Sequence, residues 1–275
     1  MSPSSGDIPD TVHIIPLGHE IDRAVQPFTK KKADRVYLLA IPPESDHDVV
    51  MREKQQHYTS EVIRRLKDLQ IEVISQPVEM FEILEVMRII SRLIVREKEQ
   101  GNQVFVNMSA CGRKTSFAVT IAAMVHGVMA YYVPADAYAT GALAHEESTH
   151  GISIVKTGKT EMLQSFQIMM PKHDSLLLLA ELFRRDLQGK GEMNTEDIFS
   201  YLKQKGVPGF EKIPSGVGRD KKPQLSRKLL NRINSSCLKE LEYQEYISRE
   251  KRGRQYYFTI TEAGKYIACV SGLVE

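Results

Sequence analysis

The chain has 275 residues, 42% of them hydrophobic and 26% charged, which is the composition of a soluble globular protein and a length that favours two domains. The N-terminus lacks the basic and apolar regions of a signal peptide, and the 3 cysteines lie far apart, so we expect a cytoplasmic protein with neither a disulfide framework nor a zinc site. The net charge of +2 is uneven, because 19 Lys and Arg stand against 14 Asp and Glu from Lys172 onward, and this excess indicates a polyanionic partner for the C-terminal part.

Apolar runs alternate with helical patterns through the first part of the chain. The predicted strands cover residues 12–17, 35–41, 71–74, 103–106 and 128–133. The predicted helices begin near Glu20 and cover residues 46–69, 81–101 and 114–126. In the helix over 46–69, the side chains expected to face inward are Val50, Tyr58, Val62, Ile63 and Leu66. This alternation predicts an α/β domain with a Rossmann-like, mostly parallel sheet and helices on both of its faces.

One stretch, Phe117–Val133, is apolar enough to resemble a membrane span. It includes His126 and Gly127 and is too short to cross a bilayer comfortably, so we expect a buried helix that leads into a strand. Residues 135–150 lose periodicity and are expected to form a loop, and residues 151–155 are expected to add an edge strand. Pro171 then marks the expected boundary between domains of residues 1–171 and 172–275.

The C-terminal part follows a different pattern. Helices are predicted over residues 175–187, over 195–205 with Asn194 as N-cap, over 224–242 and over 262–270, and a long Gly- and Pro-containing loop covers 206–222. In the third helix either Cys237 or Leu238 is expected to face inward. Strands at 246–249 and 255–260 flank a basic, Gly-containing tip at 250–254, which predicts a hairpin. This order of elements is that of a winged helix-turn-helix domain.

The third helix and the hairpin tip carry the residue types that DNA recognition needs. Arg227, Asn231 and Ser235 are four residues apart and therefore share one helix face, and Arg and Asn can read base edges with two hydrogen bonds. A winged helix that binds protein, with a merely solvated basic face, is the alternative. The residues predicted to contact double-stranded DNA are Arg227, Lys228, Asn231, Arg232, Ser235, Lys251, Arg252 and Arg254.

The sharpest local feature follows the predicted fourth strand. The strand ends at Asn107 and Ser109, a turn of small residues passes through Gly112, and a helix opens near Lys114. Backbone N–H groups, the helix dipole, two cations and several hydroxyls converge there, which is chemistry suited to phosphate. The stretch matches neither of the nucleotide-binding motifs GxGxxG and GxxxxGK[ST]. A turn whose polar residues only cap the helix is the alternative. The predicted ligand contacts here are Asn107, Ser109, Gly112, Arg113, Lys114 and Thr115.

A second polar segment follows the first predicted strand. The carboxyl ends of parallel strands meet at one sheet edge, so this segment is expected to lie beside Ser109. Gly18 allows the backbone to approach a ligand, whereas the polar residues after it can equally cap or pair within the first helix. The predicted contacts from this segment are Gly18, His19, Glu20 and Asp22.

The N-x-S-x-x-G-R-K pattern from Asn107 to Lys114, with one residue more than the family signature, resembles the CRISPR-associated Rossmann-fold (CARF) sensors. The opening segment from His13 to Leu39 resembles archaeal CARF proteins that carry a C-terminal winged helix, and the segment from Tyr246 to Ile267 resembles the wing of archaeal winged-helix regulators. The resemblance implies a homodimer that binds a cyclic oligoadenylate across its two-fold axis and regulates transcription. Phosphates would face Gly112 to Thr115, and adenines would reach toward Gly18 and His19.

The same residues bear on three other functions. Some CARF proteins carry a ribonuclease domain that uses an R-x4-6-H motif, but this chain has no histidine after His173. A ring nuclease that slowly cleaves its own ligand would use Lys114 to stabilise developing charge and Ser109 to position a ribose hydroxyl. A sensor of another anionic nucleotide would use the same cradle. We predict no catalytic, metal or cofactor site.

Overall fold

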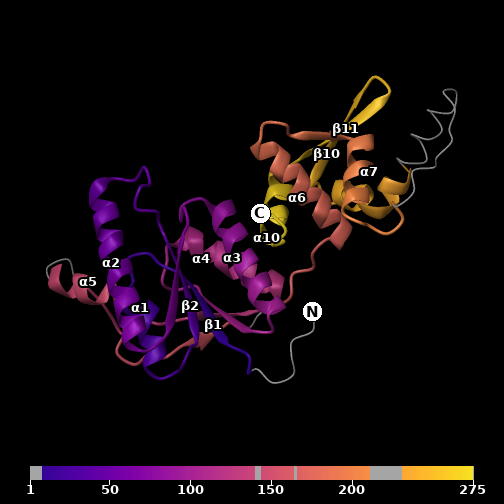
Figure 1. Cartoon of the computed structure of the whole chain (residues 1–275). Helices are drawn as coiled ribbons and strands as arrows, with labels where there is room; N and C mark the ends of the chain where they lie inside the picture. Colours follow the sequence, from indigo (N-terminus) through magenta and orange to yellow (C-terminus); the bar gives the residue numbers. More distant parts are fainter. Residues whose placement is uncertain (1–7, 140–143, 164–165, 211–230, 275) are drawn as a thin grey trace. The chain divides into compact units, whose positions relative to one another are not determined.

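The computed structural model describes residues 8–139, 144–163, 166–210 and 231–274, and the chain divides into two compact units, Met1–Ile168 and Met169–Glu275 (Figure 1). In the described residues no helix is both long and apolar enough to cross a membrane. The apolar stretch Phe117–Val133 forms the end of helix α4 (Arg113–His126) and then strand β5 (Met129–Tyr132), as predicted.

The first unit is built on a six-stranded sheet in the order β3-β2-β1-β4-β5-β8. Strands β1 to β5 are parallel, and β8 pairs antiparallel with β5. Because helices cover both faces, β1 and β2 are almost continuously apolar and buried. The predicted Rossmann-like fold is confirmed. The remaining strands are β1 (Thr11–Pro16), β2 (Arg35–Ala40), β3 (Glu72–Pro77), β4 (Gln103–Asn107) and β8 (Glu161–Met162).

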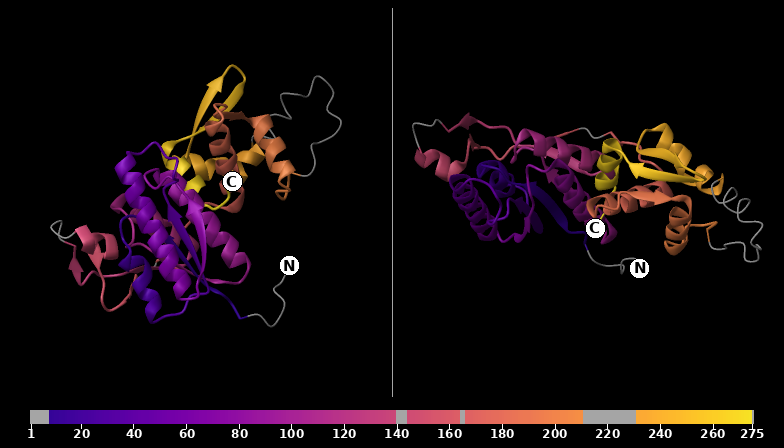
Figure 2. Two further views of the ribbon diagram at one scale, coloured as in Figure 1. Left: turned by 60° about the vertical axis from the view of Figure 1, so that its left-hand side comes forward. Right: turned by 90° about the horizontal axis from the view of Figure 1, so that it is seen from above.

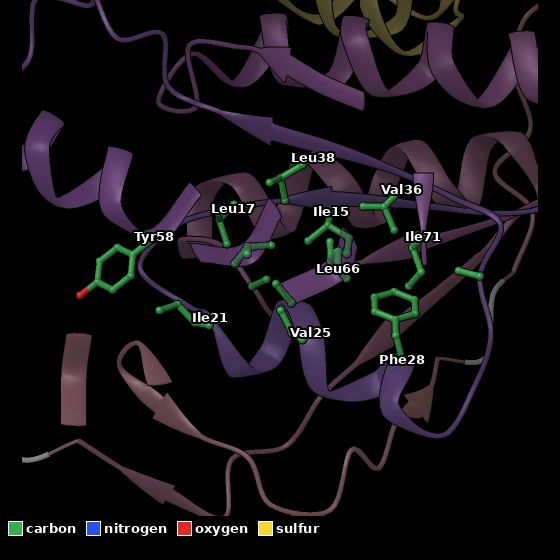
Figure 3. Packing of buried hydrophobic residues seen from close by; sticks show 14 residues of the cluster. Ile15, Leu17, Ile21, Val25, Phe28, Val36, Leu38, Tyr58, Leu66 and Ile71 are labelled. Carbon is green, nitrogen blue, oxygen red and sulfur yellow. The ribbon is translucent and has the colours of Figure 1, made fainter. Parts of the chain in front are cut away.

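Helices α1 (Asp22–Val25), η1 (Gln26–Thr29) and α2 (Val49–Asp68) lie on one face of this sheet, and α3 (Ile83–Glu99) and α4 lie on the other (Figure 1, Figure 2). On the first face, Tyr58, Val62 and Leu66 of α2 pack in one cluster with side chains of β1, β2 and α1 (Figure 3). The prediction for Val50 is wrong, because it is 69% exposed. The helix begins only at Val49, so Val50 lies in a first turn ahead of the packed part.

The segment from 135 to 155 differs from its prediction as a loop followed by an edge strand. Strands β6 (Ala137–Tyr138) and β7 (Ser153–Ile154) pair in a separate two-stranded sheet, with helix α5 (Ala144–His150) between them. The edge position beside β5 belongs to β8. Polar contacts from α2 hold α5, since the Tyr58 hydroxyl donates to Glu147 at 3.1 Å and Arg65 donates to the Thr149 carbonyl at 2.8 Å. A helix held in this way leaves no apolar periodicity in the sequence.

The second unit contains α6 (His173–Leu187), α7 (Thr195–Gln204), a helical stretch from residue 231, and α10 (Glu262–Val270). Strands β10 (Ile247–Arg252) and β11 (Gln255–Ile260) form the predicted hairpin. They extend farther than expected, so the predicted tip at 250–254 shrinks to a turn at Gly253, where φ is +63°. The short strand β9 (Glu192–Asn194) pairs with β11 and was not predicted.

The helical stretch from residue 231 contains a π-helical turn, η3 (Asn234–Leu238), and continues as α9 (Lys239–Tyr243). A π turn holds one residue more than an α turn. This extra residue explains why Cys237 and Leu238, expected as alternatives for one inward position, are both buried, at 1% and 0% exposure.

Candidate functional site

The loops that follow β1 and β4 meet at the point where the strand order reverses, because β1 leads to β2 on one side and β4 leads to β5 on the other. In open α/β sheets this crevice is the usual ligand site. The Gly18 N–H donates to the Ala110 carbonyl at 2.7 Å and fastens the two loops together. A Cβ atom at Gly18 would lie 3.5 Å from that carbonyl oxygen, so the loops already approach closely.

A cavity of about 230 Å³ opens at this crevice. It brings together residues from both predicted segments: Gly18, His19, Glu20, Gly112 and Thr115. Three further segments complete the wall of the cavity: helix α2, the loop before α3 and the segment after α5. The sequence alone did not indicate that these segments contribute. The added lining residues are Leu17, Ile41, Met51, Gln55, Met80, Phe81, Cys111 and Ile152.

The N-terminus of α4 forms one rim of the cavity. Gly112 is its N-cap and makes no side-chain cap, so the first-turn N–H groups face outward without a capping oxygen. Lys114 is exposed, and its Nζ donates to the Phe81 carbonyl at 2.6 Å, while Thr115 Oγ1 donates to the Met80 carbonyl at 2.9 Å. Arg113 is exposed and forms no ion pair with any residue that the structure describes. Neither Arg113 nor Lys114 lines the cavity itself. Arg113 directly follows the lining residue Gly112 and is the cation there that is most available to an anion.

Asn107 and Ser109 lie inside the loop rather than in the cavity wall. Asn107 is 0% exposed, and its Oδ1 accepts from the Ser109 N–H at 2.9 Å and from Ser109 Oγ at 2.7 Å. Ser109 Oγ in turn accepts from the Val133 N–H at 3.0 Å. These bonds shape the turn that presents Gly112, and they leave no Ser109 hydroxyl in the cavity to position a ribose for ring cleavage.

Glu20 and Asp22 anchor the segment after α5. Glu20 lines the cavity, and its two oxygens accept from the Ser153 hydroxyl at 2.8 Å and the Ser153 N–H at 3.0 Å. Burial raises the pKa of Glu20, while the bond from Ser153 opposes that rise. Asp22 does not line the cavity; it is 1% exposed and contacts His150 Nδ1 and the Val155 N–H, each at 2.9 Å. Both carboxylates hold the segment after α5 in place, and of the two only Glu20 also lines the cavity.

The remaining titratable groups of the cavity stay uncharged near neutral pH. His19 packs against the Tyr58 ring at 5.1 Å between centroids, and burial, with a contribution from Lys54, lowers the pKa of His19. Burial raises the pKa of the Cys111 thiol to about 12, so this sulfur is protonated rather than nucleophilic. Among the described residues, no group of His, Cys, Asp and Glu could hold a metal ion. The arrangement is suited to binding an anion at the N-terminus of α4, beside a partly apolar cavity in which the Glu20 carboxylate is paired with Arg23 at 3.3 Å.

The predicted DNA-binding face lies in the second unit. Arg227 and Lys228 fall outside the described residues. Asn231, Arg232 and Ser235 are all exposed, as a reading face requires. The Arg232 guanidinium lies 5.5 Å from the Phe210 ring centroid, and Ser235 Oγ donates to the Arg232 carbonyl at 2.9 Å, so both side chains also make contacts within the unit.

The hairpin separates its cations by face. Lys251 and Tyr256 are partners in register and lie on the same side as the buried Phe258, whereas Arg252 lies on the opposite side. Arg252 pairs with Glu192 at 2.8 Å and with Glu250 at 2.6 Å, so its charge is already compensated. Lys251 and Arg254 are exposed and form no ion pair in the described chain.

Sequence reasoning missed Arg249, which stacks on Tyr256 at 5.2 Å and pairs with Glu242 at 3.0 Å. It shares the Lys251 face of the hairpin, because residues two apart in a strand point to the same side. The sequence 247–251 has only Ile247 as an apolar residue, so no alternation in it could have indicated which side Arg249 faces.

Two family models match the chain. The model described as "HFX_2341_N:-like, N-terminal" matches residues 11–138, and the "DUF6293 C-terminal winged helix domain" matches residues 174–272. The chain is thus similar to the first family over its N-terminal unit and to the second over its C-terminal unit. The winged helix predicted from the order of helices and hairpin is thereby confirmed, and the match covers the described elements from α6 to α10 apart from His173, the first residue of α6.

Searches for whole-chain similarity give a more distant result, and no curated protein matches the chain. Can2 from Sulfobacillus thermosulfidooxidans, in complex with cyclic tetra-adenylate, is 14% identical over 94% of this chain and 61% of its own, with a TM-score of 0.37. VC1899 from Vibrio cholerae is 13% identical over 94% and 64%, with a TM-score of 0.34. Csm6 from Enterococcus italicus, bound to cyclic hexa-2′-fluoro-hexa-dAMP, is 13% identical over 86% and 55%, with a TM-score of 0.37. The chain thus spans less than two thirds of the length of each of these structures.

Proposed function

We propose that the protein is a nucleotide-responsive transcription regulator, in which the N-terminal unit binds a cyclic oligoadenylate or a related anionic nucleotide and the DUF6293 winged helix binds double-stranded DNA. The observation that carries the ligand half is the uncapped N-terminus of α4 at a cavity of about 230 Å³, with the exposed Arg113 next in the chain to the lining residue Gly112. Free N–H groups, the helix dipole and a cation at one place favour a phosphate.

The choice of nucleotide rests on the resemblance to CARF sensors. The residues from Asn107 to Lys114 carry the resemblance, and the structure gives them two tasks. Asn107 and Ser109 fix the turn from inside, while Gly112 and Thr115 line the cavity and the exposed Arg113 lies between them in the chain. Buried hydrogen bonds of Asn107 and Ser109 thus fix the loop, and the N-terminus of α4 after it stays uncapped. Such a loop is already in its binding conformation before an anion arrives.

A second copy of the chain is the proposed partner of the N-terminal unit. Large apolar side chains stand exposed around the cavity, since Phe81 is 44% exposed and Ile152 is 43% exposed, and both line it. Phe117, one turn beyond Arg113 on α4, is 56% exposed. Covering these side chains with the same surface of another protomer would bury them and would place two cradles on either side of a two-fold axis.

Exposed cations of the winged helix carry the DNA half. Lys251 and Arg254 at the hairpin turn are uncompensated by described acidic groups, and Asn231 and Ser235 lie four residues apart on an exposed helix face. Cations at a hairpin tip suit phosphate or minor-groove contact, and a polar helix face suits the major groove.

The ligand half is tested by titrating cyclic tetra-adenylate into the full chain by isothermal calorimetry. We expect Arg113→Ala to weaken affinity about tenfold or more, because it removes a charge-assisted contact to phosphate. Lys67→Ala, at an exposed position of α2, is the matched control and should bind as the wild type does. Lys114→Ala should weaken binding less than Arg113→Ala, because its ammonium already donates to Phe81. No heat of binding, or equal affinities for Arg113→Ala and wild type, would contradict the proposal.

A further inference from the structure

A second cavity, of about 290 Å³, adjoins the first between α2 and the carboxyl ends of β2 and β3. The side of α2 that faces it carries Arg52, Gln56, Thr59 and Ser60, which follow one another at helical spacing. A helix that packs on a sheet normally turns an apolar stripe toward it. Here the stripe is polar over two turns and the space beneath it is open, so this part of α2 lines a recess instead of a core.

The recess holds polar groups that lack protein partners. Arg52 Nε is buried and has no hydrogen-bond partner among the described residues, and Nη1 of the same side chain makes a long contact of 3.4 Å to the Pro43 carbonyl. The side chains of Gln56, Ser60 and Ser75 make no hydrogen bond to the part of the chain that is described. A buried guanidinium N–H left unpaired costs free energy, which a ligand acceptor atom would recover.

The lining also restricts the chemistry of the occupant. Leu38, Ala40 and three prolines provide an apolar floor and flat faces, and no Asp or Glu lines the space, so a cationic ligand has no partner. A single arginine is too little for a polyphosphate. Amide groups such as that of Gln56 can donate and accept at once, which is how Gln reads the edge of adenine. A planar, uncharged heterocycle with acceptors at its edge meets all of these conditions.

We infer that this recess binds a purine-type ring, with Arg52 Nε donating to an acceptor at the ring edge. The ring comes either from a free nucleoside or from the base of the nucleotide whose phosphate binds at α4, and the second source rests on the proposed function. The two cavities share Ile41 and Gln55 as a common wall. Gln55 is 4% exposed and fixed by its Nε2, which donates to the Leu17 carbonyl at 3.1 Å, so this wall holds its place between the two sites.

The experiment titrates adenosine, adenosine 5′-monophosphate and inorganic phosphate separately into the full chain, with binding followed by calorimetry and by saturation-transfer NMR. We expect Arg52→Ala to weaken adenosine binding about tenfold, because one hydrogen bond from a charged donor is lost. Ser60→Phe should abolish it by filling the recess from an exposed helix position. Glu53→Gln, on the exposed side of α2 outside the recess, is the control. Thermal unfolding of each variant checks that the unit is intact.

The three probes separate the outcomes. Adenosine binding that both recess variants weaken, with phosphate binding unchanged, supports the recess and does so even if phosphate does not bind at all. A gain in affinity from adenosine to adenosine 5′-monophosphate that Arg113→Ala removes identifies the base of a nucleotide as the source. If folded wild-type protein does not bind adenosine, or if Arg52→Ala and Ser60→Phe leave its affinity unchanged, the inference is overturned while the phosphate site stands or falls on its own titration.

Discussion

Glu97 shows how one side chain can bind several elements of the sheet together. It is 0% exposed, and its carboxylate accepts from Arg35 Nη1 at 3.1 and 3.2 Å, from Asn102 Nδ2 at 2.6 Å and from the Tyr37 hydroxyl. These partners belong to β2 and to the turn before β4, while Glu97 itself lies in α3. Because a buried carboxylate is costly unless its oxygens are fully paired, the four contacts keep this charge in place.

Removing Glu97 should therefore cost far more than removing an exposed carboxylate on the same helix. We expect Glu97→Ala to lower the free energy of unfolding by about 2–4 kcal/mol, because Tyr37, Asn102 and Arg35 lose one shared acceptor. Arg35 keeps its ion pairs with Glu72 and Asp10. Glu99→Ala, an exposed position two residues on, should change it by no more than about 0.5 kcal/mol. Urea unfolding followed by circular dichroism measures both. Equal small effects would show that water reaches Arg35 and replaces the carboxylate.

His13 links stability to pH through its aromatic surroundings. Its ring stacks on Phe105 at 5.0 Å and meets the edge of Phe28 at 4.8 Å, and burial, with a contribution from Lys31, lowers the pKa of His13 to about 4. Between pH 6.5 and about 4, His13 is thus protonated in the unfolded chain but neutral in the folded chain. The free energy of unfolding therefore falls as pH falls through this window.

We expect His13→Phe to make stability less dependent on pH than in the wild type, by an amount on the order of 1–3 kcal/mol across that window. At neutral pH the variant should lose a smaller amount, because Tyr131 gives up its 3.1 Å hydrogen bond to Nδ1. Urea unfolding at pH 7, 5.5 and 4.5 supplies the comparison, and parallel pH profiles of the two proteins would show that His13 is already protonated in the folded state.

At the scale of elements, hydrophobic periodicity predicted the strands and helices that are held by apolar packing. Strands β1, β2, β4 and β5 and helices α2, α3 and α4 lie within a few residues of their predicted bounds, because their buried faces repeat in the sequence. Helix α5 and strand β9 were missed, since one is held by hydrogen bonds and ion pairs and the other is only three residues long. The π turn at Asn234–Leu238 was not predicted, and it showed in the sequence only as an ambiguity over whether Cys237 or Leu238 faces inward.

The hairpin of the winged helix carries one arginine that is ion-paired and one that is not, so the two can be compared for their contribution to DNA binding. Arg254 is uncompensated by described acidic groups, whereas Arg252 already pairs with Glu192 and Glu250 and stacks 4.9 Å from the Tyr257 centroid. We expect Arg254→Ala to weaken binding to a non-specific 30-base-pair duplex and to reduce the slope of log affinity against log salt by about one. Arg252→Ala should change both much less. Fluorescence anisotropy over a salt series measures this, and a larger change for Arg252→Ala would show that its ion pairs open on DNA.

At the scale of the whole molecule, the candidate site is where prediction from sequence reached its limit. The two loops could be placed together because parallel strands end at one edge. The cavity between them also needs Met51 of α2, Phe81 ahead of α3 and Ile152 after α5, which come from far apart in the chain and carry no motif. The motif from Asn107 to Lys114 also did not show which of its polar side chains face outward. Asn107 is buried, whereas Arg113 is exposed.

Regulation requires that the two units be coupled, and thermodynamics fixes the form of that coupling. If cyclic tetra-adenylate changes the DNA affinity by some factor, then DNA must change the affinity for cyclic tetra-adenylate by the same factor. We expect a factor of about five or more in both directions, measured by anisotropy for DNA and by calorimetry for the ligand. Arg113→Ala should lose ligand affinity while keeping basal DNA affinity, and Arg254→Ala should do the reverse. Two intact binding activities with a factor of one would mean that the units act independently, and the regulator proposal would then fail although both sites remain.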